Sequence, residues 1–140
     1  MARTSSSIFI EAPSERVMEI IGDVESYPKW TAGVTDVEVL ERDLQNRPIK
    51  ARFTLNGGPI SDRVELEYTW KPFFVEWHLI SASSITALDG SYRVVENGSG
   101  CDVTYELSAE VNLPIPSFIK SAGEKTIITS ALSGLKEFAS

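Results

Sequence analysis

Val24-Glu25-Ser26-Tyr27-Pro28-Lys29-Trp30 is the stretch that decides how the rest of this chain is interpreted. It stands between a helix signal and a long run of strand signals. The stretch is too aromatic for a solvated loop, and it is too short for a core helix. We therefore expect a short helical turn that forms a lid or wall over a cavity.

The residues before this stretch predict one strand and one helix. Residues 6–10 are typical of a short strand. Pro13-Ser14-Glu15 opens the helix, because proline is tolerated in a first turn and glutamate is favoured there by the helix dipole. Gly22-Asp23 ends it. Three residues give this helix one apolar face: Val17, Ile20 and Ile21.

Downstream, from Val34 to Glu110, the apolar period changes to two. Apolar and polar residues alternate in six sets, at 37–39, 49–55, 64–70, 75–79, 88–94 and 103–109. One apolar face and one polar face per strand indicate an antiparallel sheet that is wet on one side. Gly90 falls inside a strand set, where it marks either a bulge or a close backbone approach.

A long helix is expected after Pro114-Ile115-Pro116, ending near Phe138. Its second half has an apolar stripe made of Ile127, Ile128, Ala131, Leu132, Leu135 and Phe138. Continued backwards, the stripe meets Ser117, Ser121 and Glu124, so the inward side becomes polar. Two interpretations stay open. Either the helix bends at Gly123 and resets the phase, or its early turns face a partly polar cavity.

Composition and charge exclude several function classes. The 140 residues suit one domain over 1–140, and a net charge of −7 argues against nucleic-acid binding. One cysteine, Cys101, allows no intrachain disulfide. The single histidine, His78, falls on the solvent face and allows no multi-histidine metal site. No apolar run reaches transmembrane length, and no cofactor motif occurs. We expect a cytoplasmic protein without metal, cofactor or nucleic acid, in an oligomeric state that stays open.

A long helix on one strongly twisted sheet leaves a concave apolar space, where small ligands bind. The residues expected to line that space are Tyr27, Trp30, Phe53, Leu66, Trp70, Trp77, Tyr92, Tyr105, Ser121 and Glu124. The alternative for the aromatic residues is that they only fill the core.

Glu124, Tyr92 and Tyr105 are the candidate catalytic residues. A desolvated carboxyl suits acid or base work, and a buried phenol can orient a ligand oxygen. The alternative for Glu124 is a surface position, paired with Lys120 one turn earlier.

Four short motifs occur in a fixed order along the chain. They are Tyr27-Pro28-x-Trp30, Leu88-Asp89-Gly90-Ser91-Tyr92, Gly100-Cys101-Asp102-Val103-Thr104-Tyr105 and Leu113-Pro114-x-Pro116. Together they resemble the polyketide cyclase/dehydrase and START-like lipid-transport superfamily (SRPBCC), including its coenzyme Q-binding branch of small bacterial proteins. The resemblance covers nearly the whole chain.

The resemblance implies an α+β helix-grip fold of the START/Bet v 1 type. About seven antiparallel strands would wrap a long C-terminal helix, in the order strand, two helices, six strands, helix. It also implies a pocket between sheet and helix, gated by Tyr27–Trp30 and neighbouring loops.

Three functions stay open. The first is a carrier or chaperone for a hydrophobic lipid, quinone or polyketide-like molecule. The second is an aromatase/cyclase or dehydrase acting on a polyketide-like carbonyl compound. The third is a protein-interaction module of a larger assembly, with an acidic outer face built from Asp36, Glu38, Glu65 and Glu67.

Overall fold

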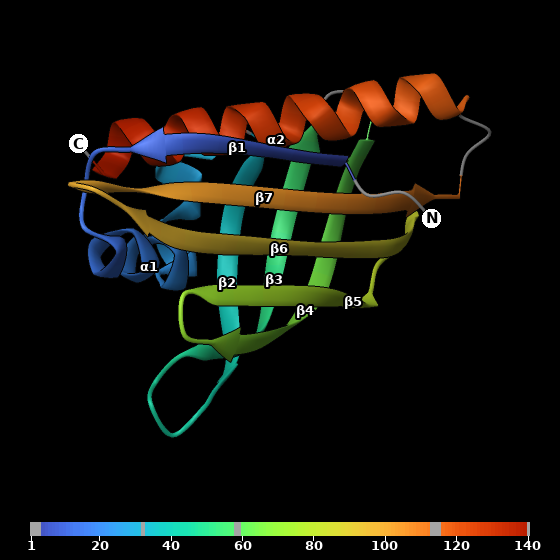
Figure 1. Ribbon diagram of the computed structural model, residues 1–140. Helices are drawn as coiled ribbons and strands as arrows, with labels where there is room; N and C mark the ends of the chain where they lie inside the picture. The colour runs from blue at the N-terminus through green and yellow to red at the C-terminus, as the bar shows by residue number, and fades with distance from the viewer. Residues whose placement is uncertain (1–3, 32, 58–59, 113–115, 140) are drawn as a thin grey trace.

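The computed structural model describes residues 4–31, 33–57, 60–112 and 116–139. It confirms the helix-grip order of one strand, two helices, six strands and a long helix (Figure 1). The elements are β1 (Thr4–Ile10), α1 (Ser14–Gly22), the 3-10 helix η1 (Val24–Lys29), β2 (Val34–Arg42), β3 (Pro48–Gly57), β4 (Ile60–Lys71), β5 (Phe74–Ser81), β6 (Ile85–Asn97), β7 (Gly100–Val111) and α2 (Ser117–Ala139). Gly58, Pro59 and the first three residues of the motif Leu113-Pro114-x-Pro116 lie outside the described residues.

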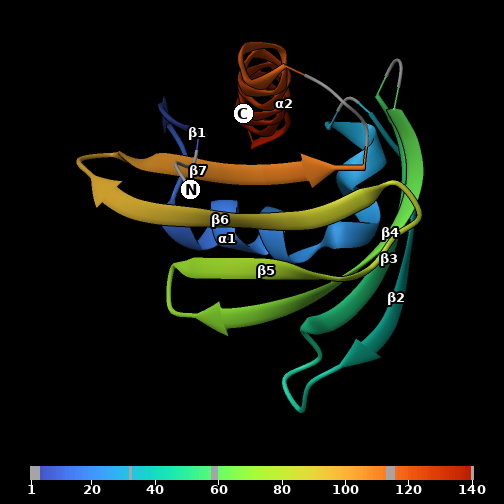
Figure 2. The same cartoon turned by 90° about the vertical axis from the view of Figure 1, so that its right-hand side faces the viewer.

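The seven strands form one antiparallel sheet in the order β1-β7-β6-β5-β4-β3-β2. β2 to β7 pair consecutively, and β1 joins the far edge beside β7. Figures 1 and 2 show that the sheet curves strongly, so that β2, β3 and β4 cross the direction of β6 and β7. α2 lies along β1 and β7, while α1 and η1 lie on the same concave side of the sheet.

α1 and η1 meet at a buried turn. The predicted apolar face of α1 is confirmed, because Val17, Ile20 and Ile21 are all buried. The backbone N–H of Asp23 bonds to the carbonyls of the last turn of α1 and ends it. The Tyr27 hydroxyl donates a 2.5 Å hydrogen bond to the Ile21 carbonyl oxygen. This contact folds η1 back on α1 and places Tyr27, together with the following Trp30, on the concave side of the sheet.

Gly90 marks a close approach and not a bulge. It pairs with Trp77 in the regular part of the β5–β6 register. A Cβ atom on Gly90 would come within 2.4 Å of Cζ2 and 2.5 Å of Cε2 of the Trp77 indole. Glycine therefore leaves the space in which this indole lies flat on the sheet.

The two halves of α2 bury different residues. In the second half the buried positions are Ile128, Ala131, Leu132, Leu135 and Ala139. Ile127 and Phe138 are 47% and 39% exposed, so the predicted stripe is too wide. Glu124 is buried at 6% exposure, four residues before Ile128, so the inward line of the second half extends one turn back to Glu124.

Candidate functional site

Eight aromatic side chains form one cluster on the concave side of the sheet. They are Tyr27, Trp30, Phe53, Tyr68, Trp70, Trp77, Tyr92 and Tyr105. Neighbouring ring centroids lie 4.5 to 6.3 Å apart, which is contact distance for aromatic pairs. All except Trp70, which is half-buried, are buried. Seven of the eight were predicted to line a ligand site, and Leu66 is also buried.

Tyr68 is the member of this aromatic cluster that the site prediction missed. It contacts Phe53, Trp70 and Trp77, so it stands at the centre of the cluster. The strand alternation places Tyr68 on the same face as Leu66 and Trp70. That signal was sufficient to include it.

The phenol hydroxyls of the cluster fall into two groups. The Tyr27 hydroxyl bonds to the backbone of α1. In the described part of the chain, the hydroxyls of Tyr68, Tyr92 and Tyr105 bond to no protein group. They are also not among the fully sealed polar atoms without a partner, which are Trp30 Nε1 and Thr31 Oγ1. The three hydroxyl oxygens therefore reach space that a water molecule can enter.

Burial fixes the protonation state of these phenols. It raises the pKa of Tyr68 and of Tyr92 well above the usual value, and the neighbouring Tyr105 phenol raises both further. Burial also raises the pKa of Tyr105. At neutral pH the three phenols keep their protons. They can donate a hydrogen bond to a ligand oxygen, but they cannot act as bases.

Glu124 faces the sheet, where it docks α2 on an edge strand. Its Oε1 accepts a 2.7 Å hydrogen bond from Thr4 Oγ1, and its Oε2 accepts a 2.8 Å bond from the Ala109 N–H. β1 begins at Thr4, opposite Leu107, so its described residues do not reach the Ala109 N–H. The alternative pairing with Lys120 does not form. A role of Glu124 in proton transfer stays a prediction.

The helix residues around Glu124 point to solvent or to the outer edge. Lys120 bonds to Glu110 at 2.7 Å. Ser121, predicted to line the ligand space, is exposed. Ser121 was predicted to face inward because the wide apolar stripe was extended backwards along the helix. In this part of α2, Glu124 is the only described side chain that is buried.

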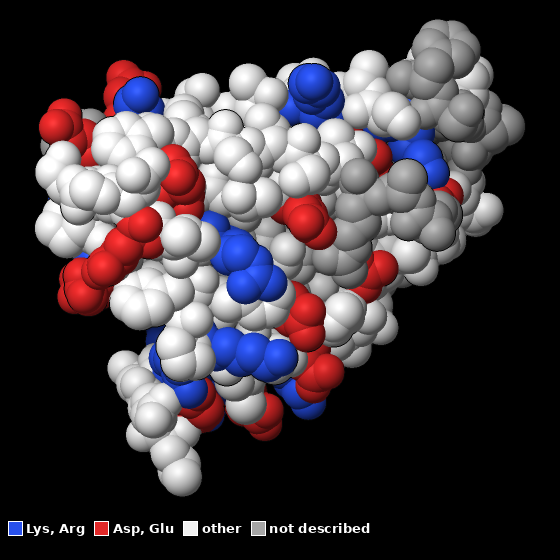
Figure 3. Space-filling model, viewed as in Figure 1, with Lys and Arg blue, Asp and Glu red and all other residues white. Residues whose placement is uncertain are grey.

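The outer face of the sheet is not the acidic surface that the sequence predicted. Arg52 bonds to Glu38 at 3.0 Å and to Glu65 at 3.2 Å. His78 is exposed as expected, and its Nδ1 lies 2.6 Å from Asp89 Oδ1. Figure 3 shows basic and acidic side chains interspersed over β5, β6 and β7 as well. Register places β3 cations opposite the acidic residues of both neighbours and makes a mixed-charge surface.

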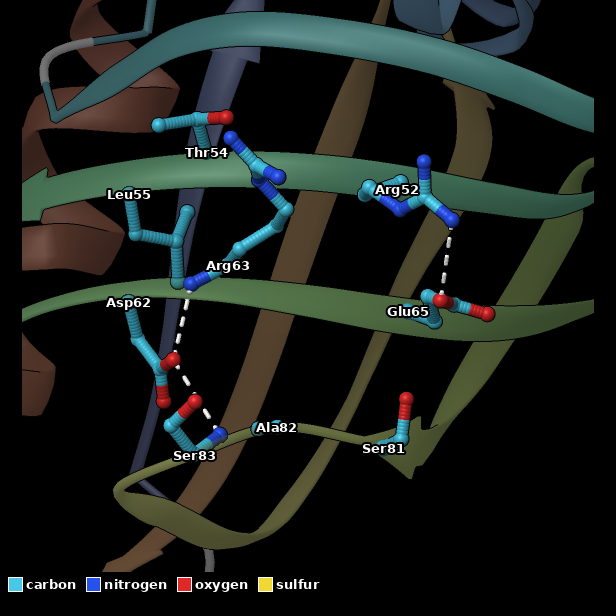
Figure 4. Close-up of a pocket in the computed structure, with 9 residues that line it drawn as sticks. All are labelled: Arg52, Thr54, Leu55, Asp62, Arg63, Glu65, Ser81, Ala82 and Ser83. Carbon is cyan, nitrogen blue, oxygen red and sulfur yellow. Dashed lines mark hydrogen bonds and ion pairs between the residues drawn. The ribbon is translucent and has the colours of Figure 1, made fainter.

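One hollow of about 580 Å³ lies beside β3, β4 and the end of β5 (Figure 4). Its lining residues are Arg52, Thr54, Leu55, Asp62, Arg63, Glu65, Ser81, Ala82 and Ser83. Asp62 accepts backbone N–H bonds from Arg63, Ser83, Ser84 and Ile85 at 2.8 to 3.2 Å. Desolvation opposes ionisation of Asp62, but these N–H groups outweigh it and lower its pKa. The carboxylates here serve the fold, since they fasten the β5–β6 connection and Arg52.

A second hollow of about 540 Å³ lies between the end of η1 and the last turns of α2. It is lined by Pro28, Lys29, Trp30, Thr31, Gly134, Glu137 and Phe138. A Cβ atom on Gly134 would come within 1.8 Å of the Trp30 carbonyl oxygen. Glycine thus allows the backbone after η1 to lie directly on the helix. Neither hollow includes Tyr68, Trp77, Tyr92 or Tyr105.

The described ranges contain neither a group of metal-binding side chains nor a helix that could cross a membrane. Within them, no cluster of three or more His, Cys, Asp or Glu side chains is placed to hold a metal ion. None of the described helices combines the length and apolar character needed to span a bilayer. Cys101 is buried, and burial raises the pKa of its thiol, as expected for a small apolar core residue.

Solved structures from distant organisms share this fold. A START superfamily protein from Mycobacterium smegmatis is 19% identical, with a TM-score of 0.92 over 98% of this chain and 96% of its own. The Zhui aromatase/cyclase from Streptomyces sp. R1128 is 13% identical, with a TM-score of 0.77 over 99% and 93%. The major latex-like protein 151 from Panax ginseng is 11% identical, with a TM-score of 0.76 over 99% and 97%. At these identities the similarity shows the fold alone.

The sequence itself gives the family. Comparison with curated protein sequences finds no match. The family model described as "Polyketide cyclase / dehydrase and lipid transport" matches residues 10–136, from the end of β1 to the last turn of α2. The chain is therefore a member of the polyketide cyclase/dehydrase and lipid transport family.

Proposed function

We propose that the protein is a carrier or chaperone for an apolar molecule that has at least one hydrogen-bond-accepting oxygen. The molecule is held between the aromatic cluster and α2. The observation that supports this most directly is the set of three phenol hydroxyls, on Tyr68, Tyr92 and Tyr105, that bond to no described protein group. Each of these hydroxyls reaches space that water can enter, so a ligand oxygen would replace a bond to water by a bond to the ligand, a net gain of about 0.5–1.5 kcal/mol. The ring faces would take up the carbon skeleton of the ligand.

Access to this space is proposed to run under the first half of α2. Among the described side chains from Ile119 to Ile127, only Glu124 is buried. Two hydrogen bonds, from Thr4 and Ala109, hold it to the sheet. Because such bonds can be exchanged for bonds to water, this half can lift at lower cost than the apolar second half.

The chemistry of the donors narrows the ligand class. Protonated phenols pair with carbonyl oxygens, as found in quinones, polyketide-like compounds and acyl lipids. The cluster has no charged side chain among its members, so a ligand that stays ionised inside it would lose hydration without gaining a counter-ion. We therefore infer a neutral ligand, at least in the part that contacts the cluster.

A second candidate function is aromatase/cyclase or dehydrase activity on a polyketide-like carbonyl substrate. The family match and the fold shared with the Streptomyces aromatase/cyclase favour it. Tyr92 and Tyr105 could polarise a substrate carbonyl by hydrogen bonding. Two observations argue against it. The phenols stay protonated at neutral pH because burial raises their pKa, so they cannot act as bases. Both carboxylate oxygens of Glu124 already accept hydrogen bonds, from Thr4 and from Ala109. Binding without turnover is therefore the better-supported function.

The test compares two ligands that differ by one oxygen, 1-tetralone and tetralin. Calorimetric titration of the full chain should show tetralone bound about two- to tenfold more tightly, the value of one net hydrogen bond. The double variant Tyr92→Phe with Tyr105→Phe should lose this preference. Tyr27→Phe is the matched control, because the Tyr27 hydroxyl is already bonded to Ile21. Equal affinity for both ligands, or binding of neither, would contradict the proposal.

A further inference from the structure

The hollow between η1 and α2 contains an unexplained polar feature. In the described part of the chain, two sealed side-chain atoms have no hydrogen-bond partner, Trp30 Nε1 and Thr31 Oγ1. Both belong to consecutive residues that line this one hollow. Trp30 is 7% exposed as a whole residue. Buried polar atoms without a partner are rare in native structures, and two on consecutive residues call for an explanation.

The hollow is open to solvent and large enough for a small molecule. Its volume of about 540 Å³ lies within the usual range of ligand pockets, about 300–1,000 Å³. Phe138 is 39% exposed and offers an apolar surface beside the Pro28 ring. The Trp30 wall is fixed from two sides, by the contact of its backbone with Gly134 and by the edge-on contact of its ring with Tyr27.

Charge decides which kind of molecule fits. Trp30 Nε1 can only donate a hydrogen bond, so the occupant must present an acceptor. The hollow lies at the C-terminal end of α2, where unpaired carbonyls give partial negative charge. Glu137 adds a full negative charge to the same wall, which offsets Lys29 across the hollow. An anionic acceptor such as a carboxylate is therefore disfavoured relative to a neutral one.

We propose that this hollow is a second binding site, separate from the aromatic interior, for an uncharged molecule with a carbonyl oxygen and an apolar body. The carbonyl accepts hydrogen bonds from Trp30 Nε1 and Thr31 Oγ1, and the body lies on Phe138. Both atoms are sealed in this structure, so binding requires the half-buried Thr31 side chain to rotate and expose them. The two sites share Trp30, but the hollow includes none of the phenols of the interior site.

The test follows the indole N–H signals of the three tryptophans in a ¹⁵N-labelled sample of the full chain. The Trp30 signal is identified by its loss in Trp30→Phe. Acetanilide, which has a phenyl ring and an amide carbonyl, should shift this signal in a saturable way. N-ethylaniline, which has nearly the same shape without the carbonyl, should bind about threefold to tenfold more weakly.

Variants separate this site from the interior and from a simple packing defect. Thr31→Val should weaken acetanilide binding about threefold to tenfold, whereas the double variant Tyr92→Phe with Tyr105→Phe should leave it unchanged. Absence of a Trp30 shift at millimolar acetanilide would overturn the proposal. It would also be overturned if Thr31→Val raised the melting temperature and left the affinity intact, since the hydroxyl would then be only a buried orphan.

Discussion

The two halves of α2 meet the sheet in different ways. The second half buries an apolar line that includes Ile128, Leu132 and Leu135, and Gly134 lies against the Trp30 backbone. The first half buries one described side chain after Phe118, the carboxylate of Glu124. Apolar burial contributes about 25 cal/mol per Å² and is lost only when the surfaces separate. Hydrogen bonds can instead be exchanged for bonds to water. The second half of α2 is therefore held by apolar packing, and the first half is held by the hydrogen bonds of Glu124, which water can replace; we call these hydrogen bonds the releasable anchor.

The largest effect is expected from Leu135→Ala in the apolar half. Leu135 is fully buried, so the substitution removes apolar contacts and leaves a cavity. It should lower the free energy of unfolding by about 2–5 kcal/mol, measured by urea denaturation. Ile127→Ala, on the exposed side of the same helix, is the control and should change it by less than about 1 kcal/mol. Similar losses for both would show that the burial of Leu135 does not determine its contribution to stability.

Gly134→Ala is expected to be the next most damaging change. The added methyl group would lie 1.8 Å from the Trp30 carbonyl oxygen, which belongs to the backbone and cannot rotate away. Overpacking of this kind costs about 1–3 kcal/mol, which exceeds the gain of about 1 kcal/mol from replacing a helical glycine. Thermal unfolding should show a lower midpoint. A raised midpoint would mean that the end of η1 is free to move away from α2.

The buried positions of the strands could be predicted from the sequence, because apolar and polar residues alternate along a strand and so mark its inner and outer faces directly. Phe53, Trp77 and Tyr105 were placed on the inner face by alternation, and all three are buried. A helix gives a weaker signal, because the width of its buried stripe depends on what it packs against. α2 contacts β1 and β7 at the sheet edge, so Ile127 and Phe138 stay exposed.

Features that join distant residues could not be predicted. The η1–α2 hollow depends on Gly134 packing against Trp30, a contact between residues about a hundred positions apart. Likewise, the pairing of Arg52 with acids on both neighbouring strands depends on register, which alternation does not specify. Without the register, the acidic residues on β2 and β4 looked like one acidic face.

Glu124→Gln tests the releasable anchor, the two hydrogen bonds of Glu124, and should lower the free energy of unfolding by an intermediate amount. The substitution removes the negative charge and turns one acceptor into a donor, facing either the Thr4 hydroxyl or the Ala109 N–H. Hydrogen bonds to charged groups contribute about 1.5–3 kcal/mol, so a loss of about 1–2 kcal/mol is expected, since one acceptor remains. Amide hydrogen exchange should rise in the first half of α2 and stay unchanged around Leu135.

Thr4→Val serves as the matched partner of that experiment. It removes one of the two bonds to Glu124 and leaves the carboxylate in place. Its effect on exchange should be in the same direction and smaller. If Glu124→Gln increased exchange evenly along the whole helix, α2 would open as one unit and the contrast between its halves would be wrong.

Gly123→Ala should produce the smallest change, and of opposite sign to Gly134→Ala. Nothing lies within 4 Å of a Cβ atom built on Gly123, which is exposed. Alanine should therefore stabilise the helix by its intrinsic propensity, about 0.5–1 kcal/mol, seen as a higher thermal midpoint. The same substitution eleven residues apart in one helix thus reports which half is packed. A loss of stability at Gly123 would favour the other interpretation of the sequence, a helix that bends there.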